Sequence, residues 1–252
     1  MTRLERCAAG AVLLLAVAAF ATCAEAKTIG IWKDSRSHIT SGLTNSLDKA
    51  GWEILYFERN DLENAEKLAK TDVMLLHGGH NAYFFASPKA RLNLIRYAAG
   101  GKGVLAAGFR SGWVRTANRP MFPEIGAVYN RVQSSWVGPV GDSPLAKAFG
   151  GKTIPLGGHD HLCLRVGKWG EVFCKSSDDP VGAFGDFYCG RVVVFGGHFM
   201  FRMVDETREA AEKLLFSQLK YLTGCSKPSE GEATIAVRKA EAEFIRREMM
   251  LT

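Results

Sequence analysis

The sequence lacks most of the features that assign a function directly. It contains no C-x-x-C pair, no run of basic residues and no internal repeat. After residue 26 it also has no continuous apolar stretch of about 18 residues, the length that a membrane-spanning helix needs. These absences argue against a C-x-x-C metal or redox motif, a basic nucleic-acid-binding tail, a repeat array and a membrane span in the mature chain.

The positive charge of the chain is dispersed. There are 32 Lys and Arg against 26 Asp and Glu, which gives a net charge of +6. The basic residues are scattered among acidic ones, without the aromatic interleaving that is typical of nucleic-acid surfaces. We therefore expect no nucleic-acid partner and, at most, a preference for anionic ligands.

The first 26 residues differ in composition from the rest. Arg3 and Arg6 precede an apolar run over 8–21, and Ala24-Glu25-Ala26 forms an A-x-A site before Lys27. This order is typical of a secretory signal peptide. It predicts an exported protein, periplasmic or secreted, with a mature chain of about 225 residues that starts near Lys27.

Cys23, at the end of the apolar run, raises the question of a lipid anchor. The preceding Phe20-Ala21-Thr22 lacks the small residue that normally stands before an acylated cysteine. We therefore expect a protein without a lipid anchor.

Four cysteines remain after removal of this segment: Cys163, Cys174, Cys189 and Cys225. In an exported chain an even number of cysteines favours disulfides. The sequence between the first two is typical of a hairpin with its turn at 167–170, which would set these two cysteines opposite each other. We predict a Cys163–Cys174 disulfide and, by elimination, a Cys189–Cys225 disulfide.

The first half of the mature chain alternates between strand and helix patterns. Strands are expected at 28–32, 53–58, 72–79 and 103–108, and helices at 37–50, 64–69 and 88–101. This alternation predicts βαβ units in a largely parallel sheet that is covered on both faces. Loops that carry function in such sheets follow the carboxyl ends of the strands, which directs attention to Asp34, residues 78–80 and residues 108–111.

The pattern changes in the second half. Short strands separated by turn residues from 126 to 197 indicate antiparallel pairing, and a strong helix follows at 205–222. Residues 225–232 read as a linker, so we divide the mature chain into a domain at 27–224 and an appendage at 225–252.

The appendage ends in a charged helix, expected at 233–250. Its apolar residues form a stripe consisting of Ile235, Ala242, Ile245 and Met249, and Glu243 stands at i,i+4 spacing from Arg247. Two interpretations stay open: the stripe packs back on the domain, or it docks on a partner protein.

Several segments, taken in order, resemble the class I glutamine amidotransferase-like superfamily. They are "HGGHNAYFF" (77–85), the helix at 88–101, "GGKGVLAAGFRSGW" (100–113) and "CGRVVVFGGHFMFR" (189–202). The domain at the N-terminus of some biotin-protein ligases is the most similar branch, with trehalose-utilisation-type proteins as neighbours. The resemblance covers roughly 27–224 and implies a flavodoxin-like three-layer α/β sandwich, whose mainly parallel central sheet has an antiparallel excursion.

Active members of that superfamily carry a G-x-C-x-G elbow and an H-x-E motif, which supply a Cys-His-Glu triad. The elbow aligns with 106–110, where Gly108 holds the nucleophile position and Arg110 replaces a glycine. The second motif aligns with 198–200, where His198 is kept and Met200 replaces the acid. The resemblance therefore implies that the family's amide hydrolysis is lost.

Ser111 is a poor substitute nucleophile. A G-x-S-x-G elbow needs glycine on both sides of the serine, and the chain has Phe109 and Trp113 there.

We therefore expect a protein that binds a small anionic or polyhydroxylated ligand, with no cofactor, at the carboxyl edge of the sheet. The residues expected to line this site are Gly78, Gly79, His80, Gly108, Arg110, Ser111 and His198. Arg110 can clamp an anionic group through its planar fork, or form an internal ion pair with Asp34 or Glu124. Both roles stay open.

Two other functions are compatible with the sequence. One is a hydrolase that uses His198 or His80 as a general base on water, with a sugar as the substrate that the trehalose-type resemblance suggests. The other is a structural or interaction protein in which side chains fill the pocket that the family resemblance implies at the carboxyl edge. A zinc site at His159, His161 and Cys163 is less well supported, because the cysteine is a disulfide candidate and no further ligand is evident.

Overall fold

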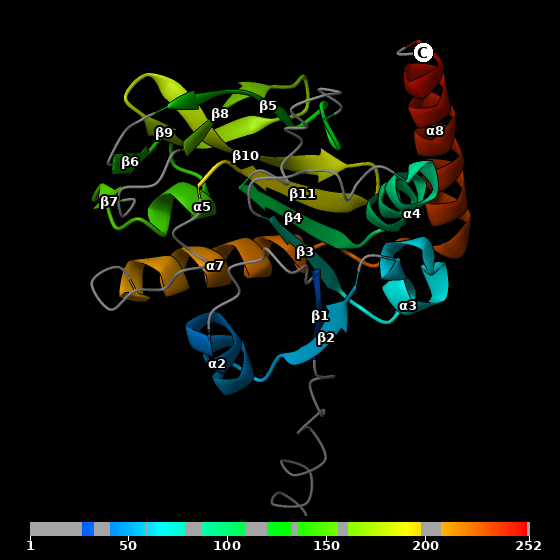
Figure 1. The fold of residues 1–252 in the computed structure, drawn as a ribbon, viewed down its shortest axis with the longest axis horizontal. Helices are drawn as coiled ribbons and strands as arrows, with labels where there is room; N and C mark the ends of the chain where they lie inside the picture. Colours follow the sequence, from blue (N-terminus) through cyan, green and yellow to red (C-terminus); the bar gives the residue numbers. More distant parts are fainter. Residues whose placement is uncertain are drawn as a thin grey trace, which may run out of the picture.

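The computed structural model describes residues 27–32, 41–58, 60–78, 87–108, 120–132, 136–155, 161–197 and 208–250. These residues form layers of helices on the two faces of a nine-stranded sheet, with a separate two-stranded sheet beside it (Figure 1). The described part of the chain contains no helix that is both long and apolar enough to cross a membrane. The architecture confirms the predicted three-layer α/β sandwich.

Five neighbouring strands make the parallel half of the large sheet. In spatial order they are β2 (Glu53–Phe57), β1 (Thr28–Trp32), β3 (Val73–Gly78), β4 (Gly103–Gly108) and β11 (Gly190–Phe195). Successive residues of β3 alternate between the two faces: Leu75 packs in one hydrophobic core and Leu76 in the other. Burial on both faces explains why these strands read as nearly continuous apolar runs.

The remaining strands of the sheet are antiparallel. Beyond β11 lie β10 (Asp179–Phe187), β9 (Glu171–Ser176), β6 (Trp136–Pro139) and β7 (Ile154–Pro155). The antiparallel excursion is thus confirmed, with one correction. The last strand of the 126–197 region, β11, is antiparallel to β10 but parallel to β4, and so it completes the parallel half.

The two-stranded sheet overturns the predicted hairpin between 163 and 174. β8 (His161–Val166) pairs with β5 (Gly126–Val132) and not with β9. The expected turn exists, since the Gly170 N–H donates to the Gly167 carbonyl at 3.0 Å, but the Gly167 N–H is bonded to the Ile125 carbonyl. An added Cβ at Gly167 would lie only 2.1 Å from the Pro123 carbonyl oxygen, so the glycine is required where the turn meets the 123–125 backbone.

The pairing of β8 with β5 bears on the predicted disulfides. Cys163 and Cys174 are both buried and free, and Cys189 and Cys225 are also free. The predicted Cys163–Cys174 disulfide is therefore wrong, because the two strands that carry these residues are not partners. The predicted Cys189–Cys225 bond is not formed either.

Helices cover both faces of the sheet (Figure 1). Against one face pack α2 (Ser41–Lys49), α5 (Pro144–Lys147) and α7 (Arg208–Leu222). Against the other pack α3 (Ala65–Ala69), α4 (Pro88–Ala99) and α8 (Glu230–Met249), together with the 3-10 turn Asp61–Glu63. The expected start of α4 is confirmed, because the Ser87 hydroxyl accepts a hydrogen bond from the Ala90 N–H and Pro88 is the first helical residue.

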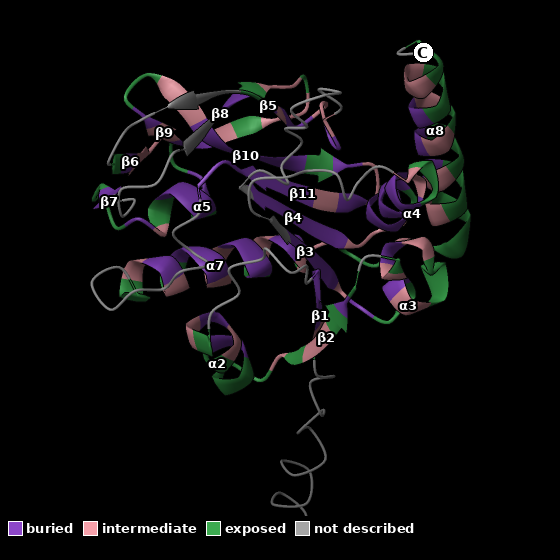
Figure 2. Ribbon diagram, viewed as in Figure 1, coloured by how far each residue is buried: buried purple, intermediate pink, exposed green. Residues whose placement is uncertain are grey.

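Helix α8 packs back on the domain, but through a different face from the expected one. Ala236, Ala240 and Phe244 are its buried residues, and they lie against α4. Of the predicted stripe, Ile245 is 50% exposed and Met249 72% exposed. Figure 2 shows this division, with buried residues toward α4 and exposed ones along the outer side.

Ion pairs explain the orientation of α8. The Arg91 guanidinium, only 4% exposed, donates to Glu248 at 2.7 Å, and Arg96 pairs with Glu241. Both arginines are on α4, so they turn the acidic side of α8 inward, and the predicted apolar stripe faces outward. The expected Glu243–Arg247 pair does not form, because Arg247 reaches Glu124 at 3.1 Å instead.

Phe244 is the centre of this contact. The guanidinium carbons of Arg91 and Arg247 lie 5.3 and 5.6 Å from its ring centroid, at cation–π distance. The adjacent Tyr188 hydroxyl donates to Glu243 at 2.9 Å. We refer to this set of residues, Arg91, Glu124, Phe244, Arg247 and Glu248, as the α8 clamp.

We predict that Phe244→Ala lowers the free energy of unfolding by about 3 kcal/mol, since it removes a buried ring and the two cation–π contacts. The matched control is Ile245→Ala, the neighbouring residue, which we expect to change stability by less than about 0.5 kcal/mol because its side chain faces solvent. Urea unfolding of both variants measures this. An equal loss in the control would mean that the sequence-predicted stripe carries the packing after all.

Candidate functional site

The carboxyl edge of the parallel strands brings the expected glycines together. β3 and β4 end in register, with Gly78 paired to Gly108, and on the other side of β4 Ala107 pairs with Phe195 of β11. The chain leaves β11 through Gly196 and Gly197 at this same edge. Gly108, which the family resemblance predicts to hold the nucleophile position, therefore terminates a central strand between two of the expected site segments.

An aromatic layer packs beneath this edge. Phe195 is fully buried and its ring is stacked on that of Phe173 from β9, with centroids 6.0 Å apart. A side chain at Gly182 or Gly197 would meet these rings, because an added Cβ would lie 2.4 Å from Phe173 and 2.6 Å from Phe195, respectively. Gly197, two residues beyond the end of β11, thus serves the packing of this layer.

Most of the residues to which the sequence directs attention at this edge lie outside the described residues. They are Asp34, Gly79, His80, Arg110, Ser111, His198 and Met200. Their roles therefore remain predictions, and they rest on the described strand ends from which these segments continue.

Glu124, one of the two acids considered as an internal partner for Arg110, has a different role in the structure. Its carboxylate accepts a hydrogen bond from Arg247 at 3.1 Å, and the same guanidinium reaches the Met121 carbonyl at 3.5 Å. Glu124 therefore belongs to the α8 clamp. The sequence contained no signal for this pairing, since 123 residues separate the two partners.

The two buried thiols among the described residues, Cys163 and Cys174, are unsuited to act as nucleophiles. Burial raises the pKa of the Cys163 thiol to about 11, with Asp179 adding to the effect, and burial alone raises the pKa of Cys174 well above its usual range. Both thiols are therefore protonated at neutral pH and are poor nucleophiles.

The two remaining cysteines lie elsewhere. Cys189 precedes β11, whose first residues pair with the start of β4, and Cys225 follows α7 at the same end of the sheet. Both are thus at the amino edge, opposite to Gly108. The described residues contain no group of three His, Cys, Asp or Glu side chains that could hold a metal ion.

Comparison with known proteins adds the fold family. No family model and no curated protein matches the sequence. Solved structures do match: PurLQS from Thermotoga maritima (17% identity, 78% of this chain and 99% of that chain covered, TM-score 0.55) and a putative ThuA-like protein from Bacteroides uniformis (14%, 79% and 93%, 0.59). A glutamine amidotransferase from Thermotoga maritima also matches (14%, 86% and 96%, TM-score 0.51).

The chain has the class I glutamine amidotransferase-like fold. At these identities the similarity to the three solved structures concerns the fold alone. The order of the strands around β4 is consistent with that fold. The three matches include amidotransferase-like and ThuA-like proteins but no biotin-protein ligase, so that finer resemblance stays a prediction.

We predict that the protein does not release ammonia from glutamine, and that Gly108→Cys does not restore the reaction. The variant supplies a thiol, but Met200 still provides no carboxylate to orient His198. A coupled ammonia assay measures this, with an active amidotransferase as the positive control. Ammonia release by the wild-type chain, in proportion to protein concentration, would contradict the prediction.

Proposed function

We propose that the protein is an exported, non-hydrolytic member of the amidotransferase-like fold that binds a small anionic or polyhydroxylated ligand at the carboxyl edge. The observation that carries the proposal is the position of Gly108. It ends a central strand where the fold's active members present their nucleophile, in register with Gly78, and glycine offers no side chain for covalent chemistry.

The chemistry of the neighbouring sequence supports binding. Arg110 and Ser111 follow Gly108 by two and three residues, and His198 directly follows the Gly196-Gly197 pair at the end of β11. A guanidinium, a hydroxyl and an imidazole together suit phosphate, carboxylate or sugar hydroxyl groups. Ligands of open parallel sheets bind in the crevice at this edge.

We predict that Arg110→Ala weakens binding of an identified ligand by about 10-fold to 100-fold, which corresponds to the loss of one or two charge-assisted hydrogen bonds. A thermal-shift screen of sugars, sugar acids and phosphorylated sugars finds the ligand, and calorimetry then compares the wild type, Arg110→Ala and the control Lys147→Ala. Full affinity in Arg110→Ala would count against the site.

The same experiment separates binding from hydrolysis. The carbohydrate-directed alternative rests on the trehalose-type resemblance of the sequence, and the ThuA-like neighbour shares only the fold. A screened sugar that is consumed, with a pH profile that disappears in His198→Ala, would replace the binding proposal by the hydrolase.

Export is compatible with the structure of the first strand. β1 starts at Thr28, whose N–H donates to the Asp72 carboxylate at 3.0 Å, so cleavage before Lys27 leaves the whole of β1 in the chain.

We predict that the chain recovered from the periplasm or medium of an expressing bacterium starts at Lys27. Intact-mass spectrometry measures this, and Ala26→Pro, which places a proline at the A-x-A site, provides the control for processing. Recovery of the chain with residues 1–26 attached would argue against the signal peptide.

A further inference from the structure

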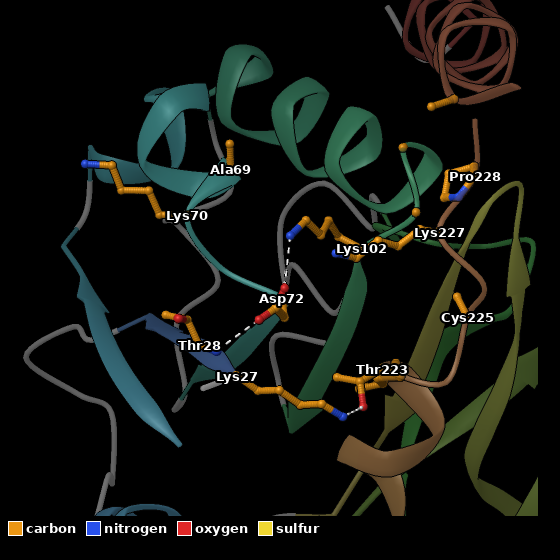
Figure 3. Close-up of a pocket in the computed structure, with 14 residues that line it drawn as sticks. Lys27, Thr28, Ala69, Lys70, Asp72, Lys102, Thr223, Cys225, Lys227 and Pro228 are labelled. Carbon is orange, nitrogen blue, oxygen red and sulfur yellow. Dashed lines mark hydrogen bonds and ion pairs between the residues drawn. The ribbon is translucent and has the colours of Figure 1, made fainter. Parts of the chain in front are cut away.

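A cavity of about 650 Å³ opens at the amino edge of the sheet, opposite to Gly108. Figure 3 shows how it lies among the starts of β1, β3 and β4, the end of α7 and the segment that leads to α8. Strand β4 has six residues, so the two edges are roughly 20 Å apart. The cavity is thus separate from the site proposed above.

A glycine closes one wall of this cavity. Gly101 has a φ of +106°, and an added Cβ there would lie 2.9 Å from the Pro228 ring. The left-handed backbone and the missing side chain let the segment after α7 pack directly against the end of α4. The wall depends on this close approach.

Lysines dominate the charge of the cavity. Lys27, Lys102 and Lys227 line it, and Lys70 stands at the rim with its ammonium directed away from Asp72 (Figure 3). Asp72 is the one acidic side chain among the described lining residues.

The Asp72 carboxylate is already paired. One oxygen accepts the Thr28 N–H at 3.0 Å, and the other accepts the Lys102 ammonium at 3.1 Å. Asp72 therefore compensates Lys102, and the other lysines of the cavity have no carboxylate partner within the described part of the chain.

Two ammonium groups keep their charge uncompensated. Lys27 donates at 2.9 Å to the Thr223 hydroxyl, which is neutral. Lys227 is exposed and has no ion pair with any residue in the described ranges. Two cations that line one cavity, with no carboxylate partner among the described residues, attract an anion that can reach both.

We propose that this amino-edge cavity binds a small phosphorylated molecule. Ammonium groups act as point charges toward phosphate, whereas the planar arginine fork that recognises carboxylates in a bidentate way is not among the described lining residues. The volume is in the range of small-molecule sites, about 300–1,000 Å³, and the partly exposed Pro228 and Ala233 offer an apolar surface to the organic part of the ligand.

The chain offers a charge-matched control. A second groove, between α5, β7 and α7, is lined by Lys147, Lys152, Lys213 and Lys220 with a single acid, Glu209. If the positive charge of the protein alone attracted phosphates, both places would contribute equally. The two places differ in their walls, because the amino-edge cavity is bounded where the segment after α7 packs against Gly101 at the end of α4, whereas the second groove lies between α5, β7 and α7.

The test is calorimetric titration of the full chain with glucose 6-phosphate and inorganic pyrophosphate, with glucose as the uncharged match. We expect both phosphates to bind and glucose not to bind. Lys27→Gln/Lys227→Gln should weaken phosphate binding at least ~10-fold, the equivalent of one charge-assisted hydrogen bond. Lys147→Gln/Lys152→Gln, equal in charge change, should weaken it less than ~2-fold. All four lysines are exposed, so both variants should fold.

Three results would overturn the proposal. One is the absence of binding of either phosphate at millimolar concentration, and another is an equal loss in the two lysine variants. The third is a loss in Arg110→Ala with none in Lys27→Gln/Lys227→Gln, which would move the phosphate to the carboxyl edge. Failure of the carboxyl-edge proposal would leave the amino-edge proposal intact. Arg110→Ala tests the carboxyl edge, whereas Lys27→Gln/Lys227→Gln tests the amino edge.

Discussion

Parallel pairing of five strands is the constraint on which the rest of the molecule depends. Because β2, β1, β3, β4 and β11 run in the same direction, all their ends meet at one edge and all their starts at the other. Residues more than a hundred positions apart, such as Gly78 and Gly197, are thereby brought to the same side. The candidate ligand site and the lysine-lined cavity are the two consequences of this single arrangement, one at each edge.

The α8 clamp shows charge and shape deciding between two faces of one helix. By hydrophobicity alone, Ile235, Ile245 and Met249 form the better packing stripe, yet these side chains face solvent. The ridge of Ala236, Ala240 and Phe244 allows α8 to approach α4 closely, and the carboxylates beside that ridge meet the arginines of α4. Two alanines that permit close approach, one buried phenylalanine and the matching ion pairs therefore prevail over the stripe of Ile235, Ile245 and Met249.

The sequence predicted the features that depend on short patterns of neighbouring residues, and it did not predict contacts between segments that are far apart in the chain. The strand over 103–108, the cap at Ser87 and the placement of Gly78 beside Gly108 follow from short patterns and from the rules of βαβ units. The wrong hairpin came from a pattern that was locally sound but did not include the competing 123–125 backbone. The amino-edge cavity had no local signal at all, since Lys27, Asp72 and Lys227 meet only once the sheet is assembled.

The two ends of the described chain lie at different places relative to the amino-edge cavity, and this affects where a label or tag can be attached. Lys27 lines the amino-edge cavity, whereas the C-terminus follows α8, whose 20 residues extend roughly 30 Å (Figure 1). An affinity tag, fluorophore or surface linker attached in front of Lys27 would stand at the mouth of the cavity. Attachment after α8 would leave both edges of the sheet accessible, so immobilisation and labelling are best designed from that end.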